Sequence, residues 1–327
     1  MKKSKILVTG GAGFIGSNIV KRLLADDRVA IVRILDNLAT GNRENIEPFL
    51  SNPKLEYVWG DIREYTTCID VCKGIDMICH QAALGSVPRS IQHPVTTNNV
   101  NITGTLNIFT AAKDLGIKRV VYAASSSTYG DSKELPKREE VIGSPISPYA
   151  VTKLVNELYA KVYGDLYNME FVGLRYFNVF GPNQDPSGAY AAVIPLFAKA
   201  ILTDEAPTIN GDGEQSRDFT FVANAVQANL KALFSENKEA LNQVYNIACG
   251  ERITVNELFF TLKEIANSDL DPNYGPSRAG DVKHSLADIS KARKFLKYEP
   301  EVTVKDGLKQ AYQWYAERFY REKNVNV

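Results

Sequence analysis

The stretch Thr9-Gly10-Gly11-Ala12-Gly13-Phe14-Ile15-Gly16 follows a short apolar run at residues 5–8 and precedes a segment with helical periodicity. Glycine is needed where a chain turns tightly between a strand and a helix, approaches a phosphate, or packs a helix closely on a sheet. Positions 10, 13 and 16 meet this need with a spacing shifted from G-x-G-x-x-G. A strand, a glycine turn and a helix in this order predict the start of a Rossmann-type fold.

Further apolar runs continue this pattern along the first half of the chain. They are rich in Val and Ile, lack strict polar alternation, and lie at residues 31–35, 55–58, 77–80, 119–124 and 171–174. Strands buried on both faces have this composition, and the segments between them are long enough for helices. We therefore predict an α/β fold in which residues 1–177 form a doubly wound parallel sheet.

A different pattern begins near residue 178. Prolines and glycines separate shorter elements, with helical periodicity near residues 193–202, 223–234, 255–266 and 304–320. This predicts a smaller mixed α/β domain over residues 178–327, mainly for substrate binding. The alternative that residues 219–248 return to the first domain stays open.

The composition limits the class of partner. Of 327 residues, 44% are hydrophobic, and 38 Lys and Arg balance 38 Asp and Glu, which is typical of an ordinary globular protein. A neutral chain has no general field for nucleic acid or anionic membrane, so we expect a small-molecule partner.

Apolar runs and cysteines bear on location. No run approaches the ~18 uncharged residues of a spanning helix, and the amino end lacks a signal peptide's apolar stretch. The four cysteines have no zinc-like spacing and are too few for a disulfide scaffold. We expect a cytoplasmic protein with no metal site.

An acidic residue strengthens the dinucleotide interpretation. Asp36 ends the second predicted strand, 20 positions after Gly16, where a carboxylate accepts hydrogen bonds from the adenosine ribose. Because a carboxylate disfavours a 2′-phosphate, the expected cofactor is NAD rather than NADP. Asp61-Ile62 after the third strand suits adenine, although an exposed loop aspartate explains Asp61 almost as well.

A possible catalytic group follows the fifth predicted strand. Ser125, Ser126 and Ser127 should lie at the carboxyl edge of the sheet, where doubly wound folds bind ligands. Tyr149 begins a predicted helix after Ser147-Pro148, and Lys153 lies one turn later on the same face. An ammonium and a nicotinamide cation both favour phenolate, so we expect the Tyr149 pKa to fall from about 10 toward neutrality.

Taken together, these motifs resemble the extended short-chain dehydrogenase/reductases, and within them the nucleotide-sugar 4-epimerases. The closest likeness is to bacterial UDP-N-acetylglucosamine 4-epimerases that also handle the corresponding uronic acids. The resemblance rests on residues 9–16, Asp36-Asn37, Gly60-Asp61-Ile62, Gln81-Ala82-Ala83, the three serines, Tyr149 with Lys153, Leu174-Arg175-Tyr176-Phe177-Asn178, Gly211-Asp212-Gly213, Arg217-Asp218 and Arg278-Ala279-Gly280-Asp281.

The resemblance implies a set of residues around NAD and a set around a UDP-sugar. Those for NAD are Gly10, Gly13, Phe14, Ile15, Gly16, Asp36, Asn37, Asp61, Ile62, Gln81, Ala82, Ala83, Tyr149 and Lys153. Those for the UDP-sugar are Gly85, Ser86, Arg89, Ser125, Ser126, Ser127, Tyr149, Asn178, Ala192, Val193, Ile209, Asn210, Arg217, Arg278, Asp281 and Ser285.

What the resemblance implies is an internal oxidation and reduction. Tyr149 takes the proton of the sugar's 4-hydroxyl, Ser125 and Ser126 hold that oxygen, and a 4-keto sugar presents its other face before reduction. Arg217 and Arg278 suit bidentate binding of the pyrophosphate while the hexose rotates.

Related 4,6-dehydratases carry an Asp-Glu pair where this chain has Ser127-Thr128, and related decarboxylases carry a Glu there. The likeness thus favours epimerisation over dehydration.

Substrate size depends on Ser285 in this comparison. Similar epimerases restricted to non-acetylated hexoses carry a tyrosine there, so serine implies space for an N-acetyl group, with UDP-Glc and UDP-Gal as poorer substrates. The segment from Gly85 to Ser90 resembles the loop of the acetamido-sugar group, and Arg89 suits a uronic carboxylate. A simple proline-containing loop explains the segment equally well.

Several alternatives stay open. A broad UDP-glucose 4-epimerase, a dehydratase, an oxidoreductase that releases NADH and a noncatalytic NAD-binding regulator share the motifs. Relatives commonly form homodimers through a four-helix bundle, which residues 98–115 and 149–163 match. Packing inside one subunit explains the apolar residues of these segments equally well, namely Leu106, Phe109, Leu154 and Leu158.

Overall fold

The larger lobe of the molecule is built on a sheet of seven parallel strands. The computed structural model describes residues 3–186, 192–276 and 283–325. In order across the sheet, the strands are β11 (Gln243–Ile247), β6 (Glu170–Tyr176), β5 (Arg119–Ser125), β4 (Met77–His80), β1 (Ser4–Thr9), β2 (Val29–Asp36) and β3 (Leu55–Trp59). The predicted Rossmann-type doubly wound sheet is confirmed.

The strand order places a binding crevice beside β1. The chain runs outward from β1 through β2 to β3, then returns to β4 on the other side of β1 and continues outward to β11. Loops on either side of such a reversal diverge, which leaves a crevice at the carboxyl ends of β1 and β4.

Helices cover both faces of the sheet because both faces are apolar. In β1, Ile6 and Val8 belong to one buried core and Leu7 to the other, since successive side chains of a strand point to opposite faces. α1 (Phe14–Leu24), α8 (Val222–Leu233) and α10 (Ser290–Leu296) contribute buried residues to the first core. α2 (Tyr65–Cys72), α5 (Thr105–Asp114) and α6 (Pro148–Tyr167) contribute to the second.

Short elements at the carboxyl edge complete this lobe. α3 (Val87–Gln92), α4 (Pro94–Asn98) and a π-helical turn at Asn99–Gly104 lead into α5. A 3₁₀ turn at Ser126–Tyr129 follows β5.

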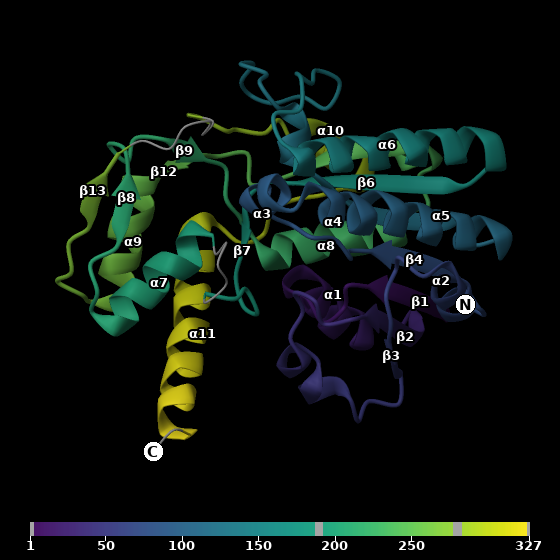
Figure 1. The fold of residues 1–327 in the computed structure, drawn as a ribbon, viewed down its shortest axis with the longest axis horizontal. Coiled ribbons are helices and arrows are strands. Elements are labelled where there is room, and N and C mark those ends of the chain that lie inside the picture. Colours follow the sequence, from purple (N-terminus) through teal and green to yellow (C-terminus); the bar gives the residue numbers. More distant parts are fainter. Residues whose placement is uncertain (1–2, 187–191, 277–282, 326–327) are drawn as a thin grey trace.

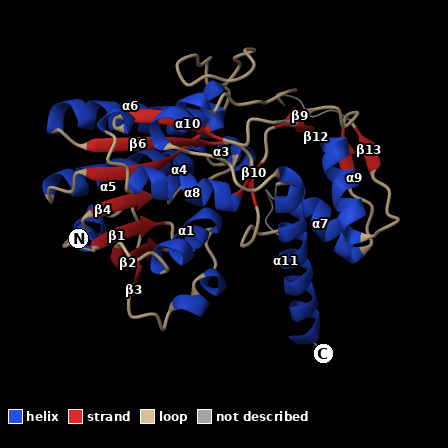
Figure 2. Cartoon of the chain, turned by 180° about the vertical axis from the view of Figure 1, so that it is seen from behind, coloured by secondary structure: helices blue, strands red, loops and turns tan. Residues whose placement is uncertain are grey.

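A smaller lobe lies beside the larger one (Figure 1). It contains α7 (Val193–Thr203), α9 (Val255–Ala266) and α11 (Val304–Val325). Its short strands pair as β7 (Val179–Phe180) with β10 (Thr220–Phe221), β8 (Thr208–Asn210) with β13 (Asn273–Gly275), and β9 (Ser216–Arg217) with β12 (Ile253–Thr254). Figure 2 shows from behind that α7, α9 and α11 form the helical part of this lobe.

Two elements from the second half of the chain join the larger lobe. β11 pairs with β6 as a seventh strand that the six apolar runs did not include, and α8 packs against β4, β5 and β6. The domain boundary at residue 177 stays a prediction. Within the described residues, no helix combines the length and apolar character needed to cross a membrane.

Candidate active site

The glycine turn between β1 and α1 is closely packed against itself. Gly10 has a φ of +69°, and a Cβ on Gly16 would lie 2.0 Å from the Gly10 carbonyl oxygen. Gly13 precedes α1 and offers no capping side chain, so the amide groups of the first helical turn stay available to an anionic ligand. The turn therefore has the form that the sequence predicted.

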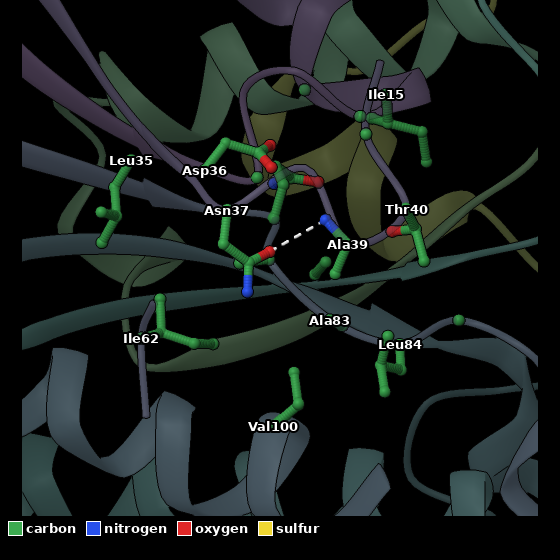
Figure 3. A pocket seen from close by; sticks show the side chains of 18 of the residues that line it. Ile15, Leu35, Asp36, Asn37, Ala39, Thr40, Ile62, Ala83, Leu84 and Val100 are labelled. Carbon is green, nitrogen blue, oxygen red and sulfur yellow. Dashed lines mark hydrogen bonds between the residues drawn. The ribbon is translucent and has the colours of Figure 1, made fainter. Parts of the chain in front are cut away.

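A cavity of about 440 Å³ opens at this turn, at the carboxyl ends of β1 and β4. Figure 3 shows side chains that converge on it from several loops. Its lining includes every residue predicted to bind NAD: Gly10, Gly13, Phe14, Ile15, Gly16, Asp36, Asn37, Asp61, Ile62, Gln81, Ala82, Ala83, Tyr149 and Lys153. The structure thus brings together residues that span 144 positions of sequence, from 10 to 153.

Asp36 is held in place by backbone groups at the rim of this cavity. Its carboxylate accepts hydrogen bonds from the amides of Ala12 at 2.9 Å and Leu38 at 2.8 Å. Burial raises the pKa of this carboxyl above its usual value. Each carboxylate oxygen retains a lone pair, so the residue suits the ribose hydroxyls of an adenosine.

Asn37 and Asp61 are connected to each other. The Asn37 side chain accepts a hydrogen bond from the Ala39 amide at 3.0 Å, drawn as a dashed line in Figure 3, and donates to Asp61 at 2.8 Å. Asp61 also pairs with Arg63 at 2.7 Å, which holds the pKa of that carboxyl below its usual value. The role of Asp61 at adenine stays a prediction, because its carboxylate already has these two partners.

Apolar side chains form part of the cavity wall. Leu35, Ile62, Leu84 and Val100 surround the opening in Figure 3 and come from β2, the loops after β3 and β4, and the π-helical turn at Asn99–Gly104. Leu35, Leu84 and Val100 were not predicted as site residues. Their signal in the sequence is weak, because an apolar residue at a strand end or helix start is typical of core.

Tyr149 and Lys153 enter the same cavity from the start of α6. Ser147 caps this helix, with its hydroxyl oxygen accepting from the Ala150 amide at 3.2 Å, and Pro148 occupies the first turn. Lys153 is buried and donates through Nζ to the Ala123 carbonyl of β5 at 2.8 Å. The predicted helix start is confirmed, and it places both side chains at the cavity.

The three serines lie where β5 ends, and Ser125 is next to Tyr149. The Ser125 hydroxyl is close enough to the Tyr149 phenol to lower its pKa. Ser127 donates through Oγ to Ser125 Oγ at 2.9 Å, and the Ser127 amide donates to the same oxygen at 3.2 Å. Ser126 occupies the first position of the 3₁₀ turn. The arrangement holds hydroxyl groups and a phenol together at the carboxyl end of β5.

Burial changes the pKa values of Tyr149 and Lys153 in the protein without cofactor. Burial raises the pKa of Tyr149 above 10, and the Ser125 hydrogen bond opposes this increase. Burial also lowers the pKa of Lys153 to about 8, although the negative charge of Glu157 partly opposes this decrease. The predicted fall of the Tyr149 pKa depends on the nicotinamide cation as well as on Lys153, and it stays a prediction. Lys153 Nζ is 5.9 Å from the ring centroid, and desolvation outweighs the attraction at that distance.

A second cavity of about 300 Å³ lies in the smaller lobe. Six residues predicted to bind the UDP-sugar line it, namely Asn178, Ala192, Val193, Ile209, Asn210 and Arg217. Asn178 donates to the Asp218 carbonyl at 2.9 Å, which fixes the direction of its amide. Gln215 and Phe219 also line this cavity and were not predicted as site residues.

The other predicted substrate residues do not line the second cavity. Gly85 lines the first cavity, whereas Ser86 caps α3 by accepting from the Arg89 amide at 3.2 Å. Ser285 is bound to the Ser216 carbonyl through its amide at 3.0 Å, in the strand that carries Arg217. Ser125, Ser126 and Ser127 do not line the first cavity, although Ser125 lies next to Tyr149, which does. Arg278 and Asp281 lie outside the described residues.

Residues 6–248 match the NAD dependent epimerase/dehydratase family. The chain belongs to this family. Its cofactor is accordingly NAD, and the glycine turn, the open first helical turn and Asp36 fit that dinucleotide.

Individual members of the NAD dependent epimerase/dehydratase family are similar over nearly the whole chain. A putative UDP-glucose 4-epimerase of Methanocaldococcus jannaschii is 40% identical over 311 residues, which cover 94% of this chain and 97% of that protein. A UDP-N-acetylglucosamine 4-epimerase from Methanobrevibacter ruminantium M1, solved with UDP-N-acetylmuramic acid, is 41% identical with a TM-score of 0.90. That match covers 97% of this chain and 100% of the other.

A third relative was solved with the cofactor. The UDP-glucose 4-epimerase of Thermus thermophilus in complex with NAD is 34% identical, with a TM-score of 0.85 over 95% of this chain and 98% of that chain. The resemblance to nucleotide-sugar 4-epimerases is confirmed at the level of the family.

Proposed function

We propose that this protein is a UDP-sugar 4-epimerase that interconverts UDP-N-acetylglucosamine and UDP-N-acetylgalactosamine. The observation that carries the proposal is the pair of cavities in separate lobes. The first holds Tyr149 and Lys153 beside a dinucleotide site, and the second offers Arg217 and polar groups for a nucleotide. A UDP-sugar bound in the second cavity would present its hexose to the first.

The side chains around Tyr149 suit proton transfer at a sugar hydroxyl. Tyr149, as the phenolate, removes the proton of the 4-hydroxyl and later returns it, and Ser125 and Ser126 hold the oxygen in place. Lys153 supplies a positive charge beside the phenolate and a donor for the nicotinamide ribose. Bound NAD supplies hydride acceptance and return. Because the hydride comes back to the same sugar, no cofactor is consumed.

Inversion requires that the hexose turns over while the nucleotide stays bound. The second cavity meets this need, since its residues are ordered by their own hydrogen bonds before substrate arrives. Arg217 donates through Nη1 to the Ser216 carbonyl at 3.0 Å and the Lys283 carbonyl at 3.1 Å. A guanidinium group held in this way suits the bidentate geometry of a pyrophosphate. Arg278 and Asp281 stay proposed partners of the nucleotide.

Preference for the acetamido sugar rests on Ser285. Its side chain is small and it is joined to the β9 strand that carries Arg217, so the segment beside the sugar path leaves room for an N-acetyl group. The Methanobrevibacter relative is a UDP-N-acetylglucosamine 4-epimerase. Gly85, Ser86 and Arg89 extend the proposal to the uronic acid forms. The names of the Methanocaldococcus and Thermus relatives favour, as a second candidate, a UDP-glucose 4-epimerase of broad specificity.

We also propose a homodimer through α5 and α6. Val151, Leu158, Val162 and Leu166 are 45%, 57%, 47% and 68% exposed, and their spacing places them along one side of α6. Phe109 is buried in the larger lobe's own core, so internal packing explains that residue. An apolar stripe of this kind suits a second copy of the chain.

An incubation of the purified protein without added NAD tests the proposal. Purified protein is mixed separately with UDP-GlcNAc, UDP-Glc and UDP-GlcA, and the products are separated by anion exchange and identified by NMR. We expect the 4-epimer of UDP-GlcNAc without added NAD and without NADH release. A 4-keto-6-deoxy sugar, or NADH formed in proportion to product, would overturn epimerisation.

Ser285→Tyr and Ser285→Thr separate the two candidate specificities. Tyrosine at this position should reduce kcat/KM for UDP-GlcNAc by more than about tenfold, or about 1.4 kcal/mol, and spare UDP-Glc. Threonine adds one methyl and should leave both substrates nearly unchanged. Equal loss of both activities in the tyrosine variant contradicts the proposed size limit.

A further inference from the structure

Asn246, near the carboxyl end of β11, connects this strand with residues 129–139 and with Asp288, which are far apart in sequence. It is fully buried, and its side-chain amide donates to the carbonyls of Lys137 at 2.8 Å and Asp288 at 3.0 Å. Its side-chain oxygen accepts from the Tyr129 hydroxyl at 2.6 Å. Its own backbone amide donates to Glu139 Oε1 at 2.8 Å. Both amide hydrogens of the side chain are therefore used.

The connected segments are those that carry the reactive and size-limiting residues of the proposed site. Tyr129 ends the 3₁₀ turn that begins at Ser126. Lys137 lies in the loop between that turn and Tyr149. Asp288 follows Ser285 by three positions. Asn246 lines neither cavity, so any influence on the sugar must pass through these partners.

Backbone hydrogen bonds extend the connection from Asn246 to Ser285. The Lys137 amide donates to the Leu286 carbonyl at 2.7 Å, and the Asp288 amide donates to the Lys137 carbonyl at 2.9 Å. On the other side, the Ser285 amide donates to the Ser216 carbonyl at 3.0 Å. The segment with Ser285 thus lies between β9 of the smaller lobe and a loop that Asn246 attaches to the sheet.

We infer that Asn246 is a positioning residue that sets the separation between the catalytic serines and the Ser285 segment, and thereby the fit of the sugar's substituent. The inference rests on the proposed function. Buried carbonyls that lose a donor must find another or move toward water, because an unsatisfied buried acceptor costs about 1–3 kcal/mol. Without the Asn246 donors, the Asp288 carbonyl would lose this partner, whereas the Lys137 carbonyl would keep the Asp288 amide. The two segments would stay joined to each other but lose this attachment to β11, which would widen or shift the path of the hexose.

Asn246→Asp removes both donors at nearly constant shape and retains an acceptor for Tyr129. Asn224→Asp is the matched control, because Asn224 is also buried and donates through its amide to a carbonyl, that of Val302 at 2.8 Å. Val302 lies two residues before α11 begins. Both substitutions replace a buried amide donor by an acceptor, so a general loss of stability should affect both.

The measurements are kcat and KM for UDP-GlcNAc and UDP-Glc, NAD content per protein, and hydrogen exchange at residues 137 and 285–288. For Asn246→Asp, we expect KM for UDP-GlcNAc to rise about tenfold or more, an altered ratio of the two substrates, and faster exchange at those amides. NAD content should stay unchanged. Asn224→Asp should keep the wild-type substrate ratio and the wild-type exchange at those amides.

Identical substrate ratios in the two variants, or unchanged exchange at residues 285–288, would overturn the inference. If Asn246→Asp does not fold, Tyr129→Phe replaces it, because phenylalanine removes only the hydroxyl bonded to Asn246. That variant should lower kcat with NAD content intact, and wild-type kinetics would refute the connection. A wild-type protein that epimerises no UDP-sugar contradicts the proposed function instead, and the exchange measurement still decides whether Asn246 holds these segments.

Discussion

Alanine at position 16 should break the glycine turn before any ligand binds. The added Cβ would lie 2.0 Å from the Gly10 carbonyl oxygen, 2.8 Å from the Gly10 carbonyl carbon and 3.0 Å from the Gly11 Cα. Because Cβ contacts under 3.0 Å are essentially unknown, α1 and the turn must separate by at least 3.0 − 2.0 = 1.0 Å. All three neighbours are backbone atoms, so no side-chain rotation relieves the overlap.

The cost follows from this displacement. Overpacking of a well-packed region destabilises by about 1–3 kcal/mol. An unfolding entropy of about 2.1 cal/mol/K per residue gives about 0.7 kcal/mol/K for a chain of this size, so Tm should fall by about 1.5–4 °C. The same shift displaces the amides of the first helical turn, and NAD affinity should fall by more than about tenfold.

Two other glycines supply the controls. A Cβ on Gly13 would meet only the Gly10 carbonyl oxygen at 3.2 Å, and Gly13 lines the cofactor cavity. Gly13→Ala should therefore keep the Tm and lose NAD affinity. Gly74 has a φ of +72° with nothing within 4 Å, so Gly74→Ala should lose about 1 kcal/mol of stability and keep NAD affinity.

Scanning calorimetry of NAD-free protein and titration calorimetry with NAD separate the three patterns. The reasoning is refuted if Gly16→Ala has a wild-type Tm and wild-type NAD affinity. It is also refuted if Gly13→Ala and Gly16→Ala lose stability equally, because the structure gives only one of them a backbone overlap.

Three further outcomes are expected around α6. Arg175 is 3% exposed and donates to the two carboxylate oxygens of Glu157 at 2.9 and 2.7 Å. Glu157→Gln removes the negative charge of this buried pair and should lower the free energy of unfolding, measured with denaturant, by about 3–5 kcal/mol. Adding Arg175→Met should recover part of this loss. The pKa of Lys153 is about 8 in the folded protein, and its ordinary value is 10.5. Between pH 8 and pH 10.5, the unfolded chain therefore keeps a proton that the folded chain has lost. Stability of NAD-free protein relative to Lys153→Met should therefore rise from pH 8 to 10.5, by up to about 3 kcal/mol, and a constant difference contradicts the burial argument. Tyr149→Phe should reduce turnover by about 10²–10⁴-fold with unchanged NAD content, and near-normal turnover contradicts the role of the phenol.

Local patterns were sufficient to predict six of the seven strands in the sheet of the larger lobe. The run 77–80 coincides with β4, and the other five runs differ from the observed strands by at most two residues at either end. β11 was not predicted because Gln243 and Asn246 interrupt its apolar pattern. Its pairing with β6 also depends on contacts between residues about 70 positions apart in the sequence. The polar group at Asn246 is itself explained by the bonds described above.

The site shows a similar division. Residues whose chemistry requires their type, such as Gly16, Asp36 and Lys153, were predicted and line the cofactor cavity. Leu84 and Val100 were missed because nothing distinguishes a cavity wall from core in a linear pattern. Burial raises the pKa of Tyr149 in the protein alone, and no linear pattern indicates this effect, since the degree of burial is a property of the folded chain.

The return of β11 and α8 to the larger lobe has a practical consequence for cutting this protein into pieces. A recombinant fragment that stops after Phe177 would leave the backbone of β6 unpaired along the side where β11 belongs. It would also uncover Val172 and Leu174, which are fully buried in the core that α8 helps to form. Unpaired apolar edge strands of this kind aggregate. The amino-terminal half should therefore precipitate unless the segment with α8 and β11 is supplied as a second polypeptide.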